Sequence, residues 1–277
     1  MIGLSKQSMN GGVNMKIGFI GVGNMAKAII KGLLKSGFES TDILVHSAHQ
    51  TSYGPFAEKN RLTAMKSNSE LVKQADAIVI AVKPYIVKTV IDEIKHVLNN
   101  DQLVITLASG ISVADLQDAL GEKQPILRTM PNVNVEIGEG MTALVANGNL
   151  TEEPFQSGAK IFEAIGGTME LDEKDFPIFS AIAGSAPAYA YLFIDALSRA
   201  GVKHGLTKTS ATTIAAQMVK GSAEMVLKSD EIPYALIDKV SSPGGTTVAG
   251  LLAMEEAGFS PAVVKGIDAT VAKEIGK

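Results

Sequence analysis

Two glycine-rich turns in the sequence could each bring backbone N–H groups close to an anion. The first reads Gly21-Val22-Gly23-Asn24-Met25-Ala26 and follows the apolar run of residues 16–20. The second reads Pro243-Gly244-Gly245-Thr246-Thr247 and leads into a helical pattern. Glycine allows the backbone to approach a ligand closely, and free N–H groups at the start of a helix attract negative charge. We therefore expect the first turn to hold a pyrophosphate and the second to suit a carboxylate.

The first turn has the G-x-G-x-x-A spacing of dinucleotide-binding turns. Gly21 allows the tight turn, Gly23 lets the backbone approach the pyrophosphate, and the small Ala26 permits close packing of the helix on the strand. An ordinary structural glycine turn is the alternative interpretation. The predicted strand before the turn and the predicted helix after it favour dinucleotide binding.

The segment after the second predicted strand bears on which dinucleotide is preferred. NAD sites usually carry an acid there, which binds the ribose 2′-OH, but Val45-His46-Ser47-Ala48-His49-Gln50 contains none. A carboxylate would repel a 2′-phosphate, whereas the Ser47 hydroxyl, with His46 or His49, could donate a hydrogen bond to one. We therefore expect a preference for NADP(H), with NAD(H) still possible because the turn contains no Arg. The alternative for both histidines is a solvated loop position.

Alternating strand and helix patterns must position the first turn. Residues 16–20, 43–46, 77–82 and 103–107 predict strands, and residues 24–36 and 86–94 predict helices. This alternation is typical of a largely parallel sheet in a doubly wound α/β domain, which we assign to residues 15–170.

The rest of the chain, residues 171–277, predicts helices and no strands. Helical patterns cover residues 188–203, 207–228, 247–257 and 261–275, and they are apolar enough to suggest packing between subunits as well as within one. The most apolar stretch, residues 181–197, contains Gly184, Ser185, Pro187 and Asp195. It therefore predicts a buried helix and not a membrane span, which needs about 20 predominantly apolar residues.

The composition excludes several kinds of chemistry and several partners. The 277 residues include no Cys, so thiolate nucleophiles, Fe–S clusters and Cys-type zinc sites are excluded. The four His residues show no ligand spacing, and we expect no metal site. A net charge of -4 gives no field that would collect nucleic acid or anionic lipid. We expect a cytoplasmic protein that starts naturally at Met15, with residues 1–14 a disordered extension.

Four motifs resemble those of the pyrroline-5-carboxylate reductase family. They are Ala81-Val82-Lys83-Pro84, Arg128-Thr129-Met130-Pro131-Asn132, Ala183-Gly184-Ser185-Ala186-Pro187-Ala188-Tyr189 and Val240-Ser241-Ser242-Pro243-Gly244-Gly245-Thr246-Thr247. The resemblance implies an N-terminal Rossmann-type domain followed by an all-α dimerisation domain. It also implies NAD(P)H-dependent reduction of 1-pyrroline-5-carboxylate to L-proline, and a homodimer or a ring of dimers. In that family the active site lies between the nucleotide domain and a helical region that includes a neighbouring subunit.

The resemblance also implies roles for individual residues. Thr247 would hydrogen-bond the imine as the catalytic residue, while Glu173, Gly245, Thr246 and Thr247 would bind the substrate. The cofactor contacts would be Ile20, Gly21, Val22, Gly23, Asn24, Met25, Ser47, Asn68, Ala81, Val82, Lys83, Pro84, Leu107, Ala108 and Ser109. From the residues alone, Thr247 could instead cap a helix, and Glu173 could be an exposed acid in a first helical turn. Lys239 departs from the family, where some relatives have Asn near the cofactor.

Two alternatives remain open at the level of the sequence. A β-hydroxyacid dehydrogenase would share the glycine turn and the helical second domain, but it needs a proton-transferring lysine, and residues 189–198 contain none. A non-catalytic NADP-binding regulator could use the same pocket. Reduction of the imine at the expense of NADPH distinguishes the enzyme from both.

Overall fold

The computed structural model describes residues 15–148 and 150–276, which divide into two compact units between Phe179 and Ser180. The prediction about residues 1–14 concerns positions outside this described part.

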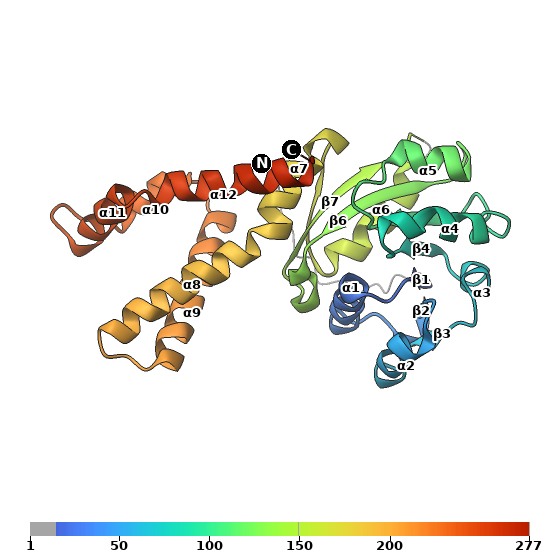
Figure 1. The fold of residues 1–277 in the computed structure, drawn as a ribbon, viewed down its shortest axis with the longest axis horizontal. Coiled ribbons are helices and arrows are strands. Elements are labelled where there is room, and N and C mark those ends of the chain that lie inside the picture. The colour runs from blue at the N-terminus through green and yellow to red at the C-terminus, as the bar shows by residue number, and fades with distance from the viewer. Residues whose placement is uncertain (1–14, 149, 277) are drawn as a thin grey trace. The chain divides into compact units, whose positions relative to one another are not determined.

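The first unit is built on an eight-stranded sheet with the order β3-β2-β1-β4-β5-β6-β7-β8. Its strands are β1 Ile17–Ile20, β2 Ile43–His46, β3 Thr63–Ala64, β4 Ala77–Ile80, β5 Leu103–Thr106, β6 Ile126–Pro131, β7 Gly140–Ala146 and β8 Gly166–Glu170. All neighbouring strands are parallel except β6 and β7, which are antiparallel. The predicted doubly wound α/β domain is therefore confirmed (Figure 1).

Helices cover both faces of this sheet, as the continuous apolar strands require. One face packs against α1 Asn24–Lys35, α2 Gln50–Lys59 and α6 Glu152–Glu163. The other face packs against α3 Asn68–Val72, α4 Pro84–Ile94 and α5 Val113–Leu120. Short helical turns occur at η1 Ser40–Asp42, η2 Val133–Ile137 and η3 Glu173–Asp175, and α7 Phe176–Phe179 ends the unit. In α1, Ile29, Ile30 and Leu33 recur at helical spacing and are fully buried against the strands.

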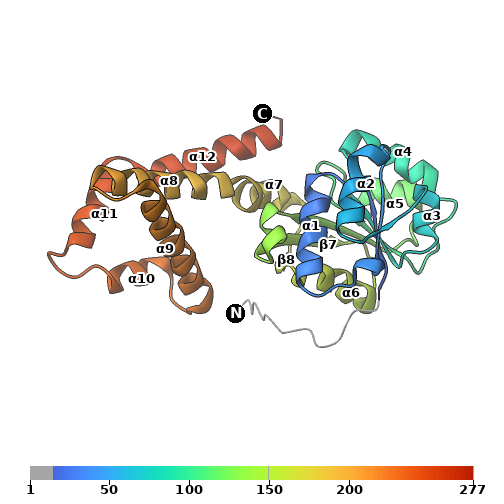
Figure 2. The ribbon, with the colours of Figure 1, turned by 90° about the horizontal axis from the view of Figure 1, so that it is seen from below.

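The second unit is helical, and among residues 180–276 the structure shows no strand. It begins with a π-helical segment, Ser180–Ser185, and continues with α8 Pro187–Lys203, α9 Lys208–Lys228, α10 Pro233–Lys239, α11 Thr246–Glu256 and α12 Phe259–Glu274 (Figure 2). The hydroxyls of Ser198 and Thr212 join α8 to α9 at 2.8 Å, and the Tyr189 hydroxyl bonds to Thr270 of α12.

The helical unit leaves large apolar side chains exposed. Leu192 is 70% exposed and Leu252 is 66% exposed, and Ser198 is the one fully buried residue of α8. The helical run Glu173–Lys203 is long and apolar enough to cross a membrane by length and composition alone. The expectation of a buried helix at residues 181–197 is therefore wrong for the single chain, in which nearly all of α8 is exposed or half-buried.

Candidate cofactor and substrate sites

The predicted cofactor residues converge at the carboxyl edge of the parallel strands. The registers pair Ile20 at the end of β1 with His46 of β2 and with Ile80 of β4, and Ile80 pairs in turn with Thr106 of β5. The segments that follow these strands therefore emerge side by side. They carry the predicted contacts Gly21 to Met25, Ser47, Ala81 to Pro84, and Leu107 to Ser109, and Asn68 lies at the start of α3 after β3.

The first glycine turn lies where the strand order reverses, with β2 on one side of β1 and β4 on the other. Such switch points hold the ligand in open α/β sheets. The Gly21 N–H donates to the His46 carbonyl at 2.8 Å, and Gly21 has φ +94°. A side chain at Gly21 would meet the Ala81 carbonyl oxygen at 2.7 Å, whereas one at Gly23 would meet nothing within 4 Å. Gly21 thus shapes the turn, and Gly23 leaves open space above it.

The N-terminus of α1 is suited to the pyrophosphate. Gly23 is its N-cap, and in the described structure no side chain bonds to the first amides and no acid lies in the first turn. Free amides at a helix start with open space at Gly23 suit a negatively charged phosphate. The small Ala26 is 1% exposed and packs into the core beside the strands, as the spacing predicted.

Two polar residues at the same edge suit the nucleoside part of the cofactor. The Asn68 amide nitrogen donates to Glu93 Oε2 at 2.6 Å, while its Oδ1 is buried with no partner among the described residues. An unsatisfied buried acceptor is costly unless a ligand donates to it. Ser47 is half-buried directly after β2.

His46 is not the solvated loop residue that the sequence left open. Its Nδ1 lies 3.0 Å from the Met65 carbonyl, and its ring packs edge-on against Tyr53. With Nδ1–H donating to that carbonyl, the neutral ring has only an acceptor at Nε2. His49 is exposed at the start of α2, where its carbonyl accepts from the Ser52 hydroxyl.

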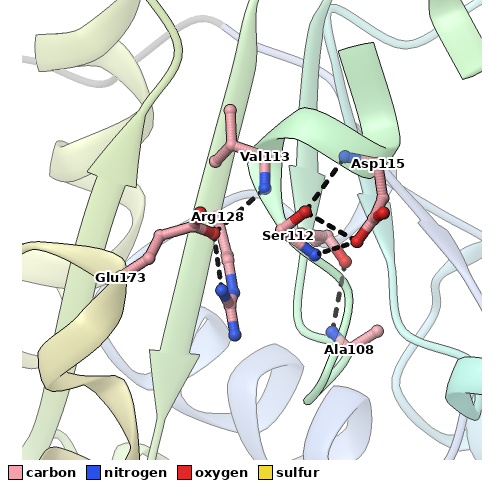
Figure 3. Close-up of polar contacts among 7 residues, drawn as sticks. Ala108, Ser112, Val113, Asp115, Arg128 and Glu173 are labelled. Carbon is pink, nitrogen blue, oxygen red and sulfur yellow. Dashed lines mark hydrogen bonds and ion pairs between the residues drawn. The ribbon is translucent and has the colours of Figure 1, made fainter. Parts of the chain in front are cut away.

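The loop after β5 is fixed at both ends by polar contacts (Figure 3). The Ala108 N–H donates to the buried Thr106 hydroxyl at 3.1 Å. At the far end, Ser112 and Asp115 form a capping box at the start of α5. The two hydrogen bonds from Ser112 lower the pKa of the Asp115 carboxyl.

Glu173 is neither free nor fully exposed. Its Oε1 lies 2.5 Å from Arg128 Nη1 and accepts the Val113 N–H at 3.0 Å. The Arg128 guanidinium is buried and lies over the Phe176 ring at 4.5 Å. The alternative of an exposed first-turn acid is therefore wrong, while the substrate contact implied by the resemblance stays a prediction. Arg128 was quoted only as part of a motif, with no role of its own. Its signal in the sequence is a charged residue inside an otherwise strand-like run.

The second glycine turn begins α11 in the helical unit. Gly244 has φ +69°, and Gly245 is the N-cap of α11, with no side chain bonding to the first amides within the described residues. Thr247 is the second residue of α11 and is exposed, so the alternative in which it caps the helix is wrong. The Ser241 hydroxyl, at the head of the turn, is buried without a partner among the described residues. Sequence reasoning gave Ser241 no role, although it belongs to the quoted motif.

Two further predictions concern charge and metal. Lys239, the departure from the family, ends α10 and pairs with Glu231 at 2.5 Å, so its charge is already compensated. In the part of the chain that the structure describes, no group of three or more metal-binding side chains occurs.

Comparison with known proteins agrees with both turns. The family model described as pyrroline-5-carboxylate reductase dimerisation matches residues 173–276. The model described as NADP oxidoreductase, coenzyme F420-dependent, matches residues 16–110.

Individual relatives match over almost their whole length. A pyrroline-5-carboxylate reductase of Escherichia coli is 39% identical over 91% of this chain and 94% of the relative. A solved 1-pyrroline-5-carboxylate reductase of Streptococcus pyogenes is 38% identical with a TM-score of 0.82, covering 95% of this chain and 99% of that one. The Plasmodium falciparum enzyme with NADP bound is 34% identical with a TM-score of 0.83, covering 95% and 98%. This similarity, which covers both glycine turns, shows that the chain belongs to the pyrroline-5-carboxylate reductase family.

Proposed function

We infer that the protein catalyses NAD(P)H-dependent reduction of the cyclic imine 1-pyrroline-5-carboxylate to L-proline, the last step of proline biosynthesis. Family membership carries this activity, and it decides against the β-hydroxyacid dehydrogenase alternative. The supporting observation in the structure is that α1 and α11 each follow a turn with a positive-φ glycine, Gly21 or Gly244, and each start at a glycine N-cap without a side-chain cap among the described residues. One suits a pyrophosphate and the other a carboxylate.

We propose that NADP(H) is preferred over NAD(H). The bound cofactor supplies the hydride, and the protein supplies binding and orientation. Gly23 and the first amides of α1 would hold the pyrophosphate, and Asn68 Oδ1 would accept from a ribose hydroxyl. The Ser47 hydroxyl would donate to a 2′-phosphate, and no acid stands beside it between residues 45 and 50 to repel that group.

The substrate proposal concerns the turn before α11. The Thr246 N–H at the start of α11 would bind the substrate carboxylate, since Gly244 and Gly245 allow close approach. The Gly245 N–H itself donates to the Ser242 carbonyl at 2.9 Å and so fixes the turn beneath the carboxylate. The Thr247 hydroxyl is exposed and is one residue further along the helix. It would donate to the ring nitrogen as a lone pair develops there during hydride transfer. A threonine hydroxyl is a poor acid, so its role is polarisation and positioning and the proton comes from water or from an already protonated imine.

Replacing Thr247 tests this assignment. We expect Thr247→Ala to lower kcat by about 100-fold or more, as loss of a donor to a developing charge does elsewhere. The Kd for NADPH, measured by fluorescence titration, should stay near that of the wild type. Thr247→Ser keeps the hydroxyl and should retain most of the activity. Unchanged turnover in Thr247→Ala would reject the catalytic role.

The wild-type assay tests the function itself. Purified protein, 1-pyrroline-5-carboxylate and NADPH should give loss of nicotinamide absorbance at the rate at which proline appears. Binding of NADPH without consumption would reject the enzyme and favour the regulator. A parallel assay with NADH gives the cofactor preference.

Self-association follows from the match to the dimerisation model, which spans the helices with exposed apolar faces. We propose that the partner is a second copy of the chain, in a homodimer or a ring of dimers. Asp195 and Arg199 interrupt the apolar surface of α8 with a charged pair, which favours a protein partner over lipid. We further propose that the protein is cytoplasmic.

A further inference from the structure

The Arg128–Glu173 ion pair lies beside the loop that follows β5, yet neither the hydride transfer nor the binding of the pyrophosphate uses it. We propose that Arg128 and Glu173 are positioning residues, which hold the loop of residues 107–112 and through it the nicotinamide end of the cofactor. The proposal rests on the proposed function in one respect, namely that Leu107, Ala108 and Ser109 contact the cofactor.

The start of this loop is fixed by the sheet. The Leu107 N–H donates to the Ile80 carbonyl at 3.1 Å, and the Ala108 N–H donates to the Thr106 hydroxyl at 3.1 Å. The Thr129 hydroxyl of β6 donates to the Thr106 carbonyl at 3.2 Å. These bonds join three neighbouring strands, so the first two residues of the loop have little freedom.

The far end of the loop depends on Glu173. The capping box of Ser112 and Asp115 fixes the first turn of α5, but both of its partners belong to that same turn. Glu173 Oε1 accepts the Val113 N–H and the Arg128 guanidinium at the same time (Figure 3). Arg128 belongs to β6 and pairs in register with Thr106, the residue that fixes the start of the loop. One carboxylate oxygen thus connects the end of the loop to the strand that supports its beginning.

The environment of the pair makes this connection rigid. Arg128 is 8% exposed, and Phe176 covers its guanidinium on one side. A buried charge that loses its partner is strongly unfavourable, so the guanidinium would move if the carboxylate were neutralised. Val113 and Leu116 also bury their side chains at the start of α5, but apolar contacts of this kind are non-directional. Loss of the pair should therefore shift the loop without unfolding the domain.

The chain offers a matched control. Glu136 also pairs with a cation across two elements, Lys31 of α1 at 2.8 Å, and it lies in the same unit. Both side chains of that pair are 43% exposed, and neither belongs to the predicted site. Glu173→Gln and Glu136→Gln therefore make the same chemical change in two ion pairs, of which the first has a buried cation and the second a more exposed one.

The experiment measures steady-state kinetics, NADPH affinity and the isotope effect with 4-deuterated NADPH for the wild type, Glu173→Gln, Arg128→Lys and Glu136→Gln. We expect kcat to fall roughly 10- to 100-fold in the first two variants, because small misplacement of reacting groups costs rates of this order. Their Kd for NADPH should stay within about threefold of the wild type, because the pyrophosphate contacts are intact. For comparison, a tenfold change in Kd corresponds to about 1.4 kcal/mol of binding free energy. The isotope effect should rise, because a displaced nicotinamide makes hydride transfer slower relative to product release. Glu136→Gln should behave as the wild type.

Three results would overturn the proposal. The first is a lower melting temperature in both variants with unchanged kcat and isotope effect, since that describes a merely structural pair. The second is a raised KM for the imine in Glu173→Gln alone with unchanged kcat, since that describes a direct substrate contact. The third is equal loss of kcat in Glu136→Gln.

Failure of the proposed function is recognised separately. If the wild type binds NADPH but does not reduce the imine, the fluorescence emission of bound NADPH still reports the surroundings of the nicotinamide. A change in that emission in Glu173→Gln and Arg128→Lys, absent in Glu136→Gln, would support the positioning role, and unchanged emission in all variants would refute it. If Arg128→Lys does not fold, Glu173→Asp, which keeps the charge on a shorter side chain, replaces it and should give an intermediate shift.

Discussion

The substitution Gly21→Ala tests how the first glycine turn is built. At φ +94° an L-residue pays about 1–2 kcal/mol, because its Cβ crowds its own carbonyl. The new methyl would also lie 2.7 Å from the Ala81 carbonyl oxygen and 2.8 Å from Val82 Cγ1, and forced overpacking typically costs about 1–3 kcal/mol. The sum, about 2–5 kcal/mol, is a large share of the 5–15 kcal/mol by which a domain is usually stable. Urea unfolding of the cofactor-free protein, at one fixed protein concentration because self-association contributes to stability, should show this loss.

Gly23→Ala is the matched control, two residues further along the same turn. Gly23 has φ -78°, and an added methyl meets nothing within 4 Å. A poorer N-cap costs about 1 kcal/mol, and the reduced freedom of the unfolded chain returns about 0.4–1 kcal/mol, so stability should stay within about 1 kcal/mol of the wild type. The methyl does fill the space assigned to the pyrophosphate, and the Kd for NADPH should rise at least tenfold, about 1.4 kcal/mol. Wild-type affinity in Gly23→Ala would refute the placement of the pyrophosphate, and wild-type stability in Gly21→Ala would refute the strain argument.

Two further substitutions concern stability away from the cofactor. Asn147→Ala removes a buried amide that accepts from the Ile126 N–H at 3.0 Å and donates to the Gln124 carbonyl at 2.8 Å. The free energy of unfolding, measured in urea, should fall by about 2–4 kcal/mol, and the Kd for NADPH should not change. Asp115→Asn tests the capping box, in which the hydrogen bonds from Ser112 lower the pKa of the Asp115 carboxyl. A carboxyl whose pKa is lower in the folded than in the unfolded state stabilises the protein at any pH above its unfolded-state pKa. This stabilisation is lost as the pH falls through the folded-state pKa. The wild type should therefore exceed Asp115→Asn in stability at pH 7, and the difference should shrink on acidification; a difference independent of pH would contradict this assignment.

The cofactor half of the molecule was largely readable from the sequence. The turn from Gly21 to Ala26, the strands on either side of it and the helix α1 follow local rules, since spacing, glycine and apolar periodicity act over a few residues. No strand was predicted at β6, β7 or β8, and the short elements were also less accessible. The two-residue strand β3 and the five-residue helix α3 lie between Leu62 and Lys73, and elements this short carry almost no periodicity of their own.

The roles of charged and buried polar groups depended on the tertiary structure. Arg128 and Glu173 are 45 residues apart in the sequence. Nothing local indicates that one carboxylate oxygen of Glu173 accepts from both Arg128 and the Val113 N–H at the start of α5. The same holds for the orphaned Asn68 Oδ1 and for His46, whose Nδ1 is engaged by a carbonyl 19 residues away. The burial of α8 within its own chain was also predicted wrongly. The sequence of an apolar helix does not show whether its own chain or a second copy would cover it.

By itself the sequence determined the alternation of strands and helices in the first domain, the all-helical second domain, the two glycine turns, the absence of sulfur chemistry and the family. These features are local, or depend only on which residue types are present. The tertiary structure alone decided that the strand ends line up at one edge, that Gly245 and not Thr247 caps α11, and that Arg128 is held by Glu173. Such facts depend on which residues meet across long separations in the chain, and that is set by the packing of the whole domain and not by any local pattern.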